Sequence, residues 1–298
     1  MKTKQDDVLI RIRENYTRLS KGQKRLADYI LEHYDKAVYL TAAKLGACCD
    51  VSESTVVRFA SELGYDGYPG MQRAMEEIIR TRLTALQRME VSQSRMDKDH
   101  LLGSVLRSDI NHIKETINLA DQEAFDEATK MILKAKTIYI LGVRSSAPLS
   151  IYLGYYLTLF FDDVRVVGTN TISETFEQLL KIGPEDVLIG ISFPRYSKRT
   201  VKAMNFAHSR GAGVIAITDN DQAPVVPPSD CCLKAYSNMI SFVDSLVGPM
   251  SLINALIVAL SMERSEEVEG VLSSLENIWR EYDVYESQED DTFGKILS

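Results

Sequence analysis

The spacing of apolar residues over residues 39–69 predicts two short helices joined by a tight turn. The first helix ends at Cys49, a turn of Asp50 and Val51 follows, and Ser52 opens the second helix. The apolar residues of the second helix recur at i, i+3, i+4 and i+7 and form one buried stripe: Val56, Phe59, Ala60 and Leu63. The pattern therefore predicts a helix–turn–helix whose second helix buries one face.

The front of the second helix carries small polar side chains and one guanidinium. Ser52 is a good N-cap and Thr55 lies three residues later, so polar groups gather at the helix start. A slim, hydrogen-bonding front suits the major groove of DNA, and the start of a recognition helix is the part that meets bases and phosphates. The alternative is an ordinary helical hairpin. The predicted DNA contacts are Ser52, Ser54, Thr55 and Arg58.

The whole N-terminal region, residues 1–80, reads as helical. Ser20 and Gln23 have the spacing of a capping box, which opens a helix running to about Tyr34. Residues 81–98 are polar and rich in Gln, Ser and Arg, so they predict a helix extension followed by a linker.

Two more segments have the period of an amphipathic helix. Residues 101–119 place one apolar face together: Leu102, Val105, Leu106, Ile110, Ile113 and Ile117. A last helix, about 267–285, is expected to bury its apolar residues against the domain or a partner subunit: Leu272, Leu275, Ile278, Trp279 and Tyr282. The remaining residues, 286–298, predict an acidic, loosely held tail.

Between these helices, short β-branched runs alternate with segments long enough for helices. The runs are 137–142, 164–168, 187–192, 213–218 and 231–235. Near-continuous apolar strands that alternate with helices indicate a parallel sheet covered on both faces. The sequence therefore predicts an all-α N-terminal domain followed by a doubly wound α/β domain with a five-stranded parallel sheet.

A length of 298 residues suggests about two domains. We divide the chain into a helix–turn–helix domain, a linker with an amphipathic helix, the α/β domain, and a C-terminal helix with an acidic tail. These parts are residues 1–80, 81–124, 125–265 and 266–298.

The net charge of −8 at first argues against DNA as a partner. Residues 1–80, however, hold 13 Lys and Arg against 12 Asp and Glu, a net +1, so the other residues carry −9. The acidity thus lies outside the helix–turn–helix. Because phosphate contacts drive DNA affinity and one domain near +1 offers few, we expect two copies to bind together, in a homodimer or homotetramer.

Cysteine and histidine usage gives no sign of a metal or cofactor site. The four cysteines form two adjacent pairs, Cys48–Cys49 and Cys231–Cys232, and no C-x-x-C spacing occurs. We expect buried, reduced thiols in a cytoplasmic protein. No run approaches the roughly 20 apolar residues that span a bilayer, and the N-terminus has no apolar stretch typical of a signal peptide.

Two strand-to-helix turns carry the chemistry of the second domain, residues 141–148 and 190–197. Ligands of open parallel sheets bind at the carboxyl ends of strands, where a following helix offers free N–H groups and a positive dipole end. Serine hydroxyls add donors, and positive charge lies nearby on Arg144, Arg195, Lys198 and Arg199. The turns therefore suit a phosphate ester or another anion. Alternatively, Ser145 and Ser197 only cap helices.

The N-terminal residues resemble the helix–turn–helix domain of RpiR-type bacterial regulators. That family has recurring motifs V-S-x-x-T-V-x-R-F and L-G-Y-x-G-[FY], which match VSESTVVRF and LGYDGY here. The resemblance covers about the first 80 residues. One departure is Leu45-Gly46, where the family usually has Leu-Ala; glycine costs about 1 kcal/mol relative to alanine in a helix, so we expect a shift in helix packing without a change of class.

Residues about 125–262 resemble a sugar isomerase (SIS) domain, the phosphosugar-binding module of sugar isomerases and of RpiR-type sensors. The first turn of that family, G-x-G-x-S, corresponds to Gly142-Val143-Arg144-Ser145-Ser146. The resemblance implies that the phosphate-binding serine falls on Ser146, with Ser145 beside it.

The second turn of the SIS family, S-x-S-G-x-T, is only partly kept. Counted back from the helix-ending Gly211, Ser192 takes the first serine and Ser197 the threonine, whereas Pro194 replaces the middle serine and Arg195 the glycine. Arg195 supplies charge where hydrogen bonds are lost. The resemblance therefore implies a phosphosugar effector but leaves a sugar acid or another anion open.

Three functions are compatible with these features. The first, which the sequence favours, is a DNA-binding transcriptional regulator without enzymatic activity whose operator affinity responds to a phosphosugar or sugar acid bound by Ser145, Ser146, Ser192, Arg195 and Ser197. The second is a phosphosugar isomerase or lyase with Glu174 or Glu177 as its base, although both carboxylates suit a solvated helix face. The third is an adaptor that uses its helices for association only.

Overall fold

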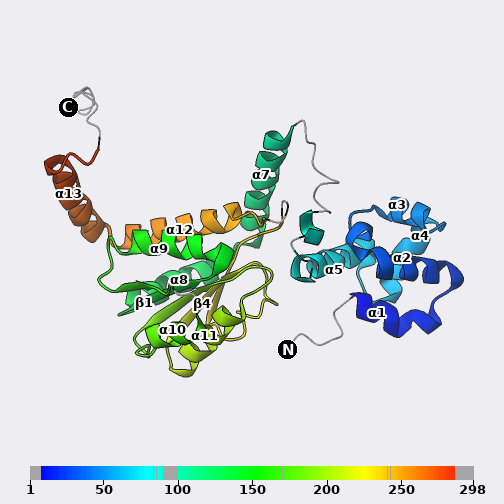
Figure 1. The fold of residues 1–298 in the computed structure, drawn as a ribbon, viewed down its shortest axis with the longest axis horizontal. Coiled ribbons are helices and arrows are strands. Elements are labelled where there is room, and N and C mark those ends of the chain that lie inside the picture. Colours follow the sequence, from blue (N-terminus) through cyan, green and yellow to red (C-terminus); the bar gives the residue numbers. More distant parts are fainter. Residues whose placement is uncertain are drawn as a thin grey trace.

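The computed structural model describes residues 8–82, 84, 86–89, 100–168, 171–239, 241 and 243–285. The predicted tail, residues 286–298, and most of the linker lie outside this description. The N-terminal helices gather in one helical unit and the sheet lies in another (Figure 1). The N-terminal elements are α1 (Val8–Asn15), η2 (Tyr16–Arg18), α2 (Lys21–Ala37), α3 (Ala42–Cys48), α4 (Glu53–Glu62) and α5 (Gly67–Arg82).

The capping box at the start of α2 is confirmed. The Ser20 hydroxyl accepts the Gln23 N–H at 3.4 Å, and the Gln23 side-chain oxygen accepts the Ser20 N–H at 2.9 Å. The predicted end near Tyr34 was three residues short, because the helix resumes after a non-helical His33 and continues to Ala37.

The helix–turn–helix itself is also confirmed. The predicted stripe of α4 is buried in the core of the N-terminal domain: Val56, Phe59, Ala60 and Leu63. The departure from the family pattern at Gly46 is explained by steric crowding. A Cβ atom there would lie 2.7 Å from the Val51 carbonyl oxygen, which real Cβ atoms avoid, and the Val51 N–H donates to the Gly46 carbonyl at 2.9 Å. Glycine therefore lets the turn fold tightly against α3.

The second unit is an α/β domain with the predicted strands. Its elements are α7 (Leu101–Leu119), α8 (Gln122–Lys134), β1 (Ile138–Gly142), η3 (Arg144–Ser146), α9 (Ala147–Leu157), β2 (Val164–Val166), α10 (Ile172–Gln178), β3 (Val187–Ile191), α11 (Lys198–Ser209), β4 (Gly213–Thr218), β5 (Cys231–Lys234), α12 (Val247–Glu263) and α13 (Ser265–Glu281). All strands pair in parallel in the order β2-β1-β3-β4-β5. This order reverses between β1 and β3, the usual ligand-binding point of such sheets.

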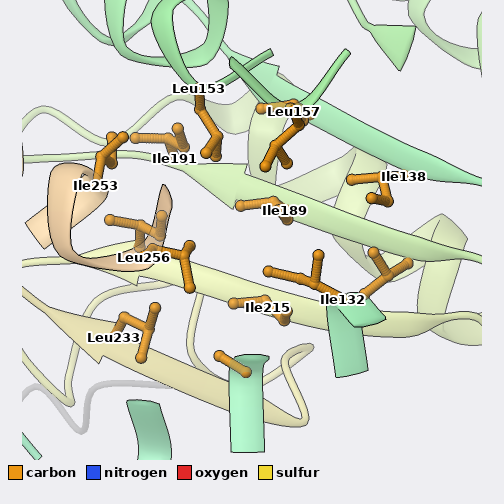
Figure 2. Close-up of a cluster of buried hydrophobic side chains, with 14 of the residues drawn as sticks. Ile132, Ile138, Leu153, Leu157, Ile189, Ile191, Ile215, Leu233, Ile253 and Leu256 are labelled. Carbon is orange, nitrogen blue, oxygen red and sulfur yellow. The ribbon is translucent and has the colours of Figure 1, made fainter. Parts of the chain in front are cut away.

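Alternate residues of each strand supply the two faces of the sheet. On one face, α8, α9 and α12 cover the strands, and Figure 2 shows Leu153, Leu157 and Ile253 turned toward the isoleucines of β1, β3 and β4. On the other face, α11 packs through Ala203, Met204 and Ala207. Because both faces are buried, the strands read as continuous apolar runs.

Both amphipathic helices expose apolar side chains; for the last helix, burial against the domain or against a partner subunit was expected. The α13 helix has no buried residue, and Ile278 is 47% exposed, so burial of its stripe against this chain's own domain is wrong. It also begins at Ser265 and ends at Glu281, earlier than predicted. The α7 helix buries only His112 and Thr116, while its predicted apolar face, led by Leu102 and Ile117, lies in solvent.

The cysteines are free thiols, as expected. Burial raises the pKa of Cys49 to about 11 and that of Cys232 to about 12, so both stay protonated at neutral pH. Cys48, however, is exposed, which contradicts the expectation that all four are buried. Within the described ranges, no three His, Cys, Asp or Glu side chains lie close enough to hold a metal, and no helix there could cross a membrane.

Candidate functional site

The predicted DNA contacts gather at the start of α4. The Ser52 hydroxyl accepts the Thr55 N–H at 3.3 Å and lies 2.8 Å from the Ser54 hydroxyl. Ser52, Ser54 and Arg58 are exposed and Thr55 is half-buried. The Arg58 Nε donates to the Ser54 carbonyl at 3.4 Å. The four side chains therefore form one accessible polar surface, with a cation between one and two helical turns from the N-cap.

Contacts from neighbouring helices fix the orientation of α4. The Gln23 amide of α2 donates to Glu62 at 2.6 Å. The Arg25 guanidinium, also from α2, is 3.3 Å from Asp50. Asp50 has a φ of +51°, a left-handed conformation that aspartate tolerates and that closes the turn before α4. The polar surface of α4 is thus held on a rigid support.

A cavity of about 430 Å³ lies at the carboxyl ends of β1 and β3. Its walls are the turn after β1, the turn after β3 and the loop that precedes α12. The lining residues are Val143, Arg144, Ser145, Ser146, Pro148, Ser192, Phe193, Pro194, Arg195, Ser197, Val243, Asp244 and Leu246. All five residues that the sequence predicts as ligand contacts therefore meet in one cavity. Their role as contacts stays a prediction.

The turn after β1 depends on Gly142. A Cβ atom there would lie 2.4 Å from the Ser146 carbonyl oxygen, so no other residue lets the chain fold back into η3. The turn places Ser146 at the start of α9, buried, with no side-chain bond to the helix end. Ser145 is exposed at the mouth of the cavity and does not cap α9. The Ser146 hydroxyl is therefore not used for capping.

The turn after β3 is held by its own serines. The Ser192 hydroxyl accepts the Ser197 N–H at 3.2 Å. Ser197 caps α11, because its hydroxyl accepts the N–H groups of Arg199 at 3.2 Å and Thr200 at 3.4 Å. The capping alternative for Ser197 is thus confirmed. A serine oxygen that accepts N–H bonds still has its own hydrogen to donate, so both hydroxyls can also meet an anion.

Two arginines of the cavity wall have a left-handed backbone. The φ angle is +57° at Arg144 and +59° at Arg195. This conformation crowds the Cβ atom and costs roughly 1–2 kcal/mol for a residue other than glycine. Both side chains are exposed and line the cavity. Sequence reasoning placed Arg195 in the site and Arg144 nearby, but neither conformation could be read from the sequence.

The third wall contains a residue that sequence reasoning missed. The Asp244 carboxylate lines the cavity and lies 2.6 Å from the Arg88 guanidinium. Arg88 comes from the helical turn at residues 86–89, and its side chain is only 1% exposed. Its partner lies 156 residues away in the sequence. No local pattern marks such a pair.

The loop before α12 also contacts both domains. Met239 packs against the core of the N-terminal helices, and the Ser245 hydroxyl donates to Asp109 of α7 at 2.7 Å. The cavity therefore shares one loop with the helix–turn–helix domain, the linker and α7.

The carboxylates suggested as a catalytic base lie elsewhere. Glu174 and Glu177 are exposed on α10, and neither lines the cavity. Asp244 is the single carboxylate among the described lining residues, and it is paired with Arg88. The cavity thus has donors and cations for holding an anion.

Two family models match the chain. Residues 6–81 match the helix-turn-helix domain of the rpiR family, and residues 131–259 match the SIS domain. A protein of Haemophilus influenzae named as an uncharacterized HTH-type transcriptional regulator is 27% identical over 232 residues, which are 77% of this chain and 80% of the relative.

Solved structures share the fold. The sugar isomerase domain of the RpiR transcription factor from Sphaerobacter thermophilus is 27% identical with a TM-score of 0.56, over 60% of this chain and 99% of that domain. The Vibrio vulnificus NanR protein, complexed with ManNAc-6P, is 21% identical with a TM-score of 0.59, over 94% of this chain and 99% of that one. Both domains and their order agree with these matches, and the chain belongs to the RpiR-type transcriptional regulators.

Proposed function

We propose that this regulator binds operator DNA through α4 and that an anionic sugar metabolite in the cavity controls its operator affinity. The observation that carries the proposal is the convergence of the two serine turns on one cavity whose third wall is joined to the linker. NanR, which shares the fold, has been described in a complex with ManNAc-6P. A phosphosugar or sugar acid is therefore the effector class, and the cytoplasm, where bacterial DNA lies, is the place of action.

We propose no catalysis in the cavity. An isomerase needs a group that moves protons next to the sugar carbons. The described lining residues offer only Asp244, which the Arg88 guanidinium holds at 2.6 Å. The effector should therefore leave the cavity chemically unchanged.

We propose that two copies associate through the exposed apolar faces. A monomer rarely exposes contiguous apolar surface of this extent. Exposed large apolar side chains lie on α12 and on three helices that pack against it, including Leu102, Leu106, Ile110 and Ile117 of α7, Ile151 and Tyr155 of α9, Val258 and Met262 of α12, and Leu272 and Ile278 of α13. A twofold pair would cover these faces and present two α4 helices to two half-sites.

We propose that the loop before α12 transmits the effector signal. Its Asp244 lines the cavity and pairs with Arg88, and its Ser245 bonds to α7, a helix with an exposed apolar face. A ligand that moves the loop therefore moves both the linker and the subunit contact. This arrangement lets one cavity alter the spacing of two DNA-reading heads.

Arg58→Ala should weaken binding to an operator selected from a random DNA pool. If Arg58 contacts a base, the loss should be about 1–3 kcal/mol and concentrated at one base position. Fluorescence anisotropy with single-base operator variants measures it. Lys181→Ala, which removes a similar charge from the α/β domain, is the control. Equal affinity of wild type and Arg58→Ala would mean that another surface reads the DNA.

Light scattering at micromolar concentration should give at least twice the 33.5 kDa mass of one chain. Ile110→Glu puts a charge on the apolar face of α7 and should shift the mass toward the monomer. Asn111→Glu, which the helical period puts on the other side of α7, should not. A monomeric wild type would argue against this interface. An Ile110→Glu variant that stays as dimeric as Asn111→Glu would do the same.

Ser146→Ala should remove the effector response and keep operator binding in the absence of effector. The measurement is operator affinity with and without saturating N-acetylmannosamine 6-phosphate, glucose 6-phosphate or 6-phosphogluconate. In wild type, the effective compound should change affinity roughly 5–150-fold. Ser209→Ala, at the far end of α11, serves as the control. A full response in Ser146→Ala would contradict the site, and a converted sugar after incubation would make the protein an enzyme.

Arg88→Met should separate effector binding from the DNA response. The variant keeps an apolar stem but leaves Asp244 without its partner, and breaking a buried pair in this way is strongly unfavourable. At saturating effector, measured directly by calorimetry, operator affinity should change several-fold less than in wild type. Gln87→Met, the exposed neighbour, should respond normally. A wild-type response in Arg88→Met would show that the signal takes another route.

A further inference from the structure

The two left-handed arginines of the cavity replace glycines of the family pattern. Arg144 stands where the first turn of the SIS family has its second glycine, and Arg195 stands at the glycine of the second turn. The backbone still has the left-handed conformation that glycine favours, with φ of +57° and +59°. The chain therefore keeps the shape of both turns and accepts a strained residue at each.

Strain that persists at two matched positions of one cavity indicates a function for the side chains. Among the described residues, neither the Arg144 nor the Arg195 side chain forms a hydrogen bond or ion pair, whereas the cavity's carboxylate, Asp244, is neutralised by Arg88. The cavity walls consequently hold two uncompensated positive charges in a chain of net charge −8.

The serines and the helix starts already supply what a phosphate needs. Ser146 lies at the start of α9, Ser192 follows the end of β3 and Ser197 caps α11. In the family pattern, turns of this kind hold a phosphosugar with glycine in place of either arginine. The additional cations thus match an additional negative group. A carboxylate is the group that a guanidinium binds best, through two parallel N–H bonds.

We propose that the effector is a phosphorylated sugar acid and that Arg144 and Arg195 select its carboxylate. The inference rests on the proposed function, because it refines the ligand of the same cavity. The phosphate meets the serine hydroxyls, and the carboxylate meets the guanidinium groups on the cavity wall. The cavity of about 430 Å³ has room for a ligand with both groups.

The test uses two pairs of open-chain probes that differ chiefly in the carboxylate. The pairs are 6-phosphogluconate with sorbitol 6-phosphate, and 3-phosphoglycerate with glycerol 3-phosphate. Calorimetry on the full chain should show that wild type prefers the acid by about tenfold or more in at least one pair, as a charge-assisted bond predicts. Arg144→Gly and Arg195→Gly should reduce that preference several-fold, because each should lower the affinity for the acid more than the affinity for the partner that lacks the carboxylate.

Glycine variants are informative because they relieve the strained backbone. Without ligand, they should unfold at the same or a higher temperature than wild type, so lost selectivity cannot be blamed on misfolding. If either glycine variant is less stable, Arg144→Asn and Arg195→Asn repeat the test, since asparagine also tolerates this conformation. Lys198→Ala, a neighbouring cation outside the cavity lining, is the matched control for general loss of charge and should keep the preference.

The outcomes separate the carboxylate proposal from the proposed function. A preference for the acid that disappears in the arginine variants supports the proposal. Equal affinity within both pairs, or a preference that survives the variants, overturns it and leaves the proposed function standing if the phosphates without a carboxylate bind. If none of the four compounds binds to wild type, the proposal and the proposed sugar-phosphate site fail together.

Discussion

The parallel pairing of β1 with β3 sets the geometry on which the cavity depends. Their register aligns Gly142 with Ile191, so both strands end at the same level of the sheet. From β1 the chain continues to β2 on one side of this pair, and from β3 it continues to β4 on the other side. The space beyond the ends of β1 and β3 is therefore left uncovered. Two turns that are far apart in the sequence consequently open into the same volume. The sheet core drawn in Figure 2 is the support that keeps this alignment fixed.

The Arg88–Asp244 ion pair connects that cavity to the rest of the molecule. A buried pair adds little net stability, since desolvation offsets most of the attraction, but its geometry is demanding. Here one partner lies on the linker side and the other in the cavity wall, so the pair is satisfied only while the two parts keep their present distance. A negatively charged ligand in the cavity would repel the Asp244 carboxylate and so weaken its pairing with Arg88. Electrostatics thus gives the linker a reason to respond to what fills the cavity.

Much of the fold could be predicted from the sequence because its signals are local. The central strands β1, β3 and β4 are almost entirely apolar since both faces are covered, and the α4 stripe repeats with the helical period. The amphipathic patterns of α7 and α13 predicted an apolar face on each helix, but they did not indicate which surface packs against it. The ion pair of Arg88 could not be predicted, because its partner Asp244 lies 156 residues away in the sequence. The conformations of Arg144 and Arg195 oppose residue preference, so only the three-dimensional structure reveals them. The five predicted ligand residues converged because strand ends share one edge.

The tight turn at Gly46 has a consequence for how a signal can reach DNA. With no room for even a methyl group against the Val51 carbonyl, α3 and α4 cannot slide or tilt against each other without breaking the turn. The bonds from Gln23 and Arg25 lock the same pair to α2. Each head is therefore a rigid body with a fixed reading surface. In the proposed dimer, regulation would therefore act on the distance and angle between two such bodies, and the effector would change which spacing of half-sites fits rather than which base sequence is read.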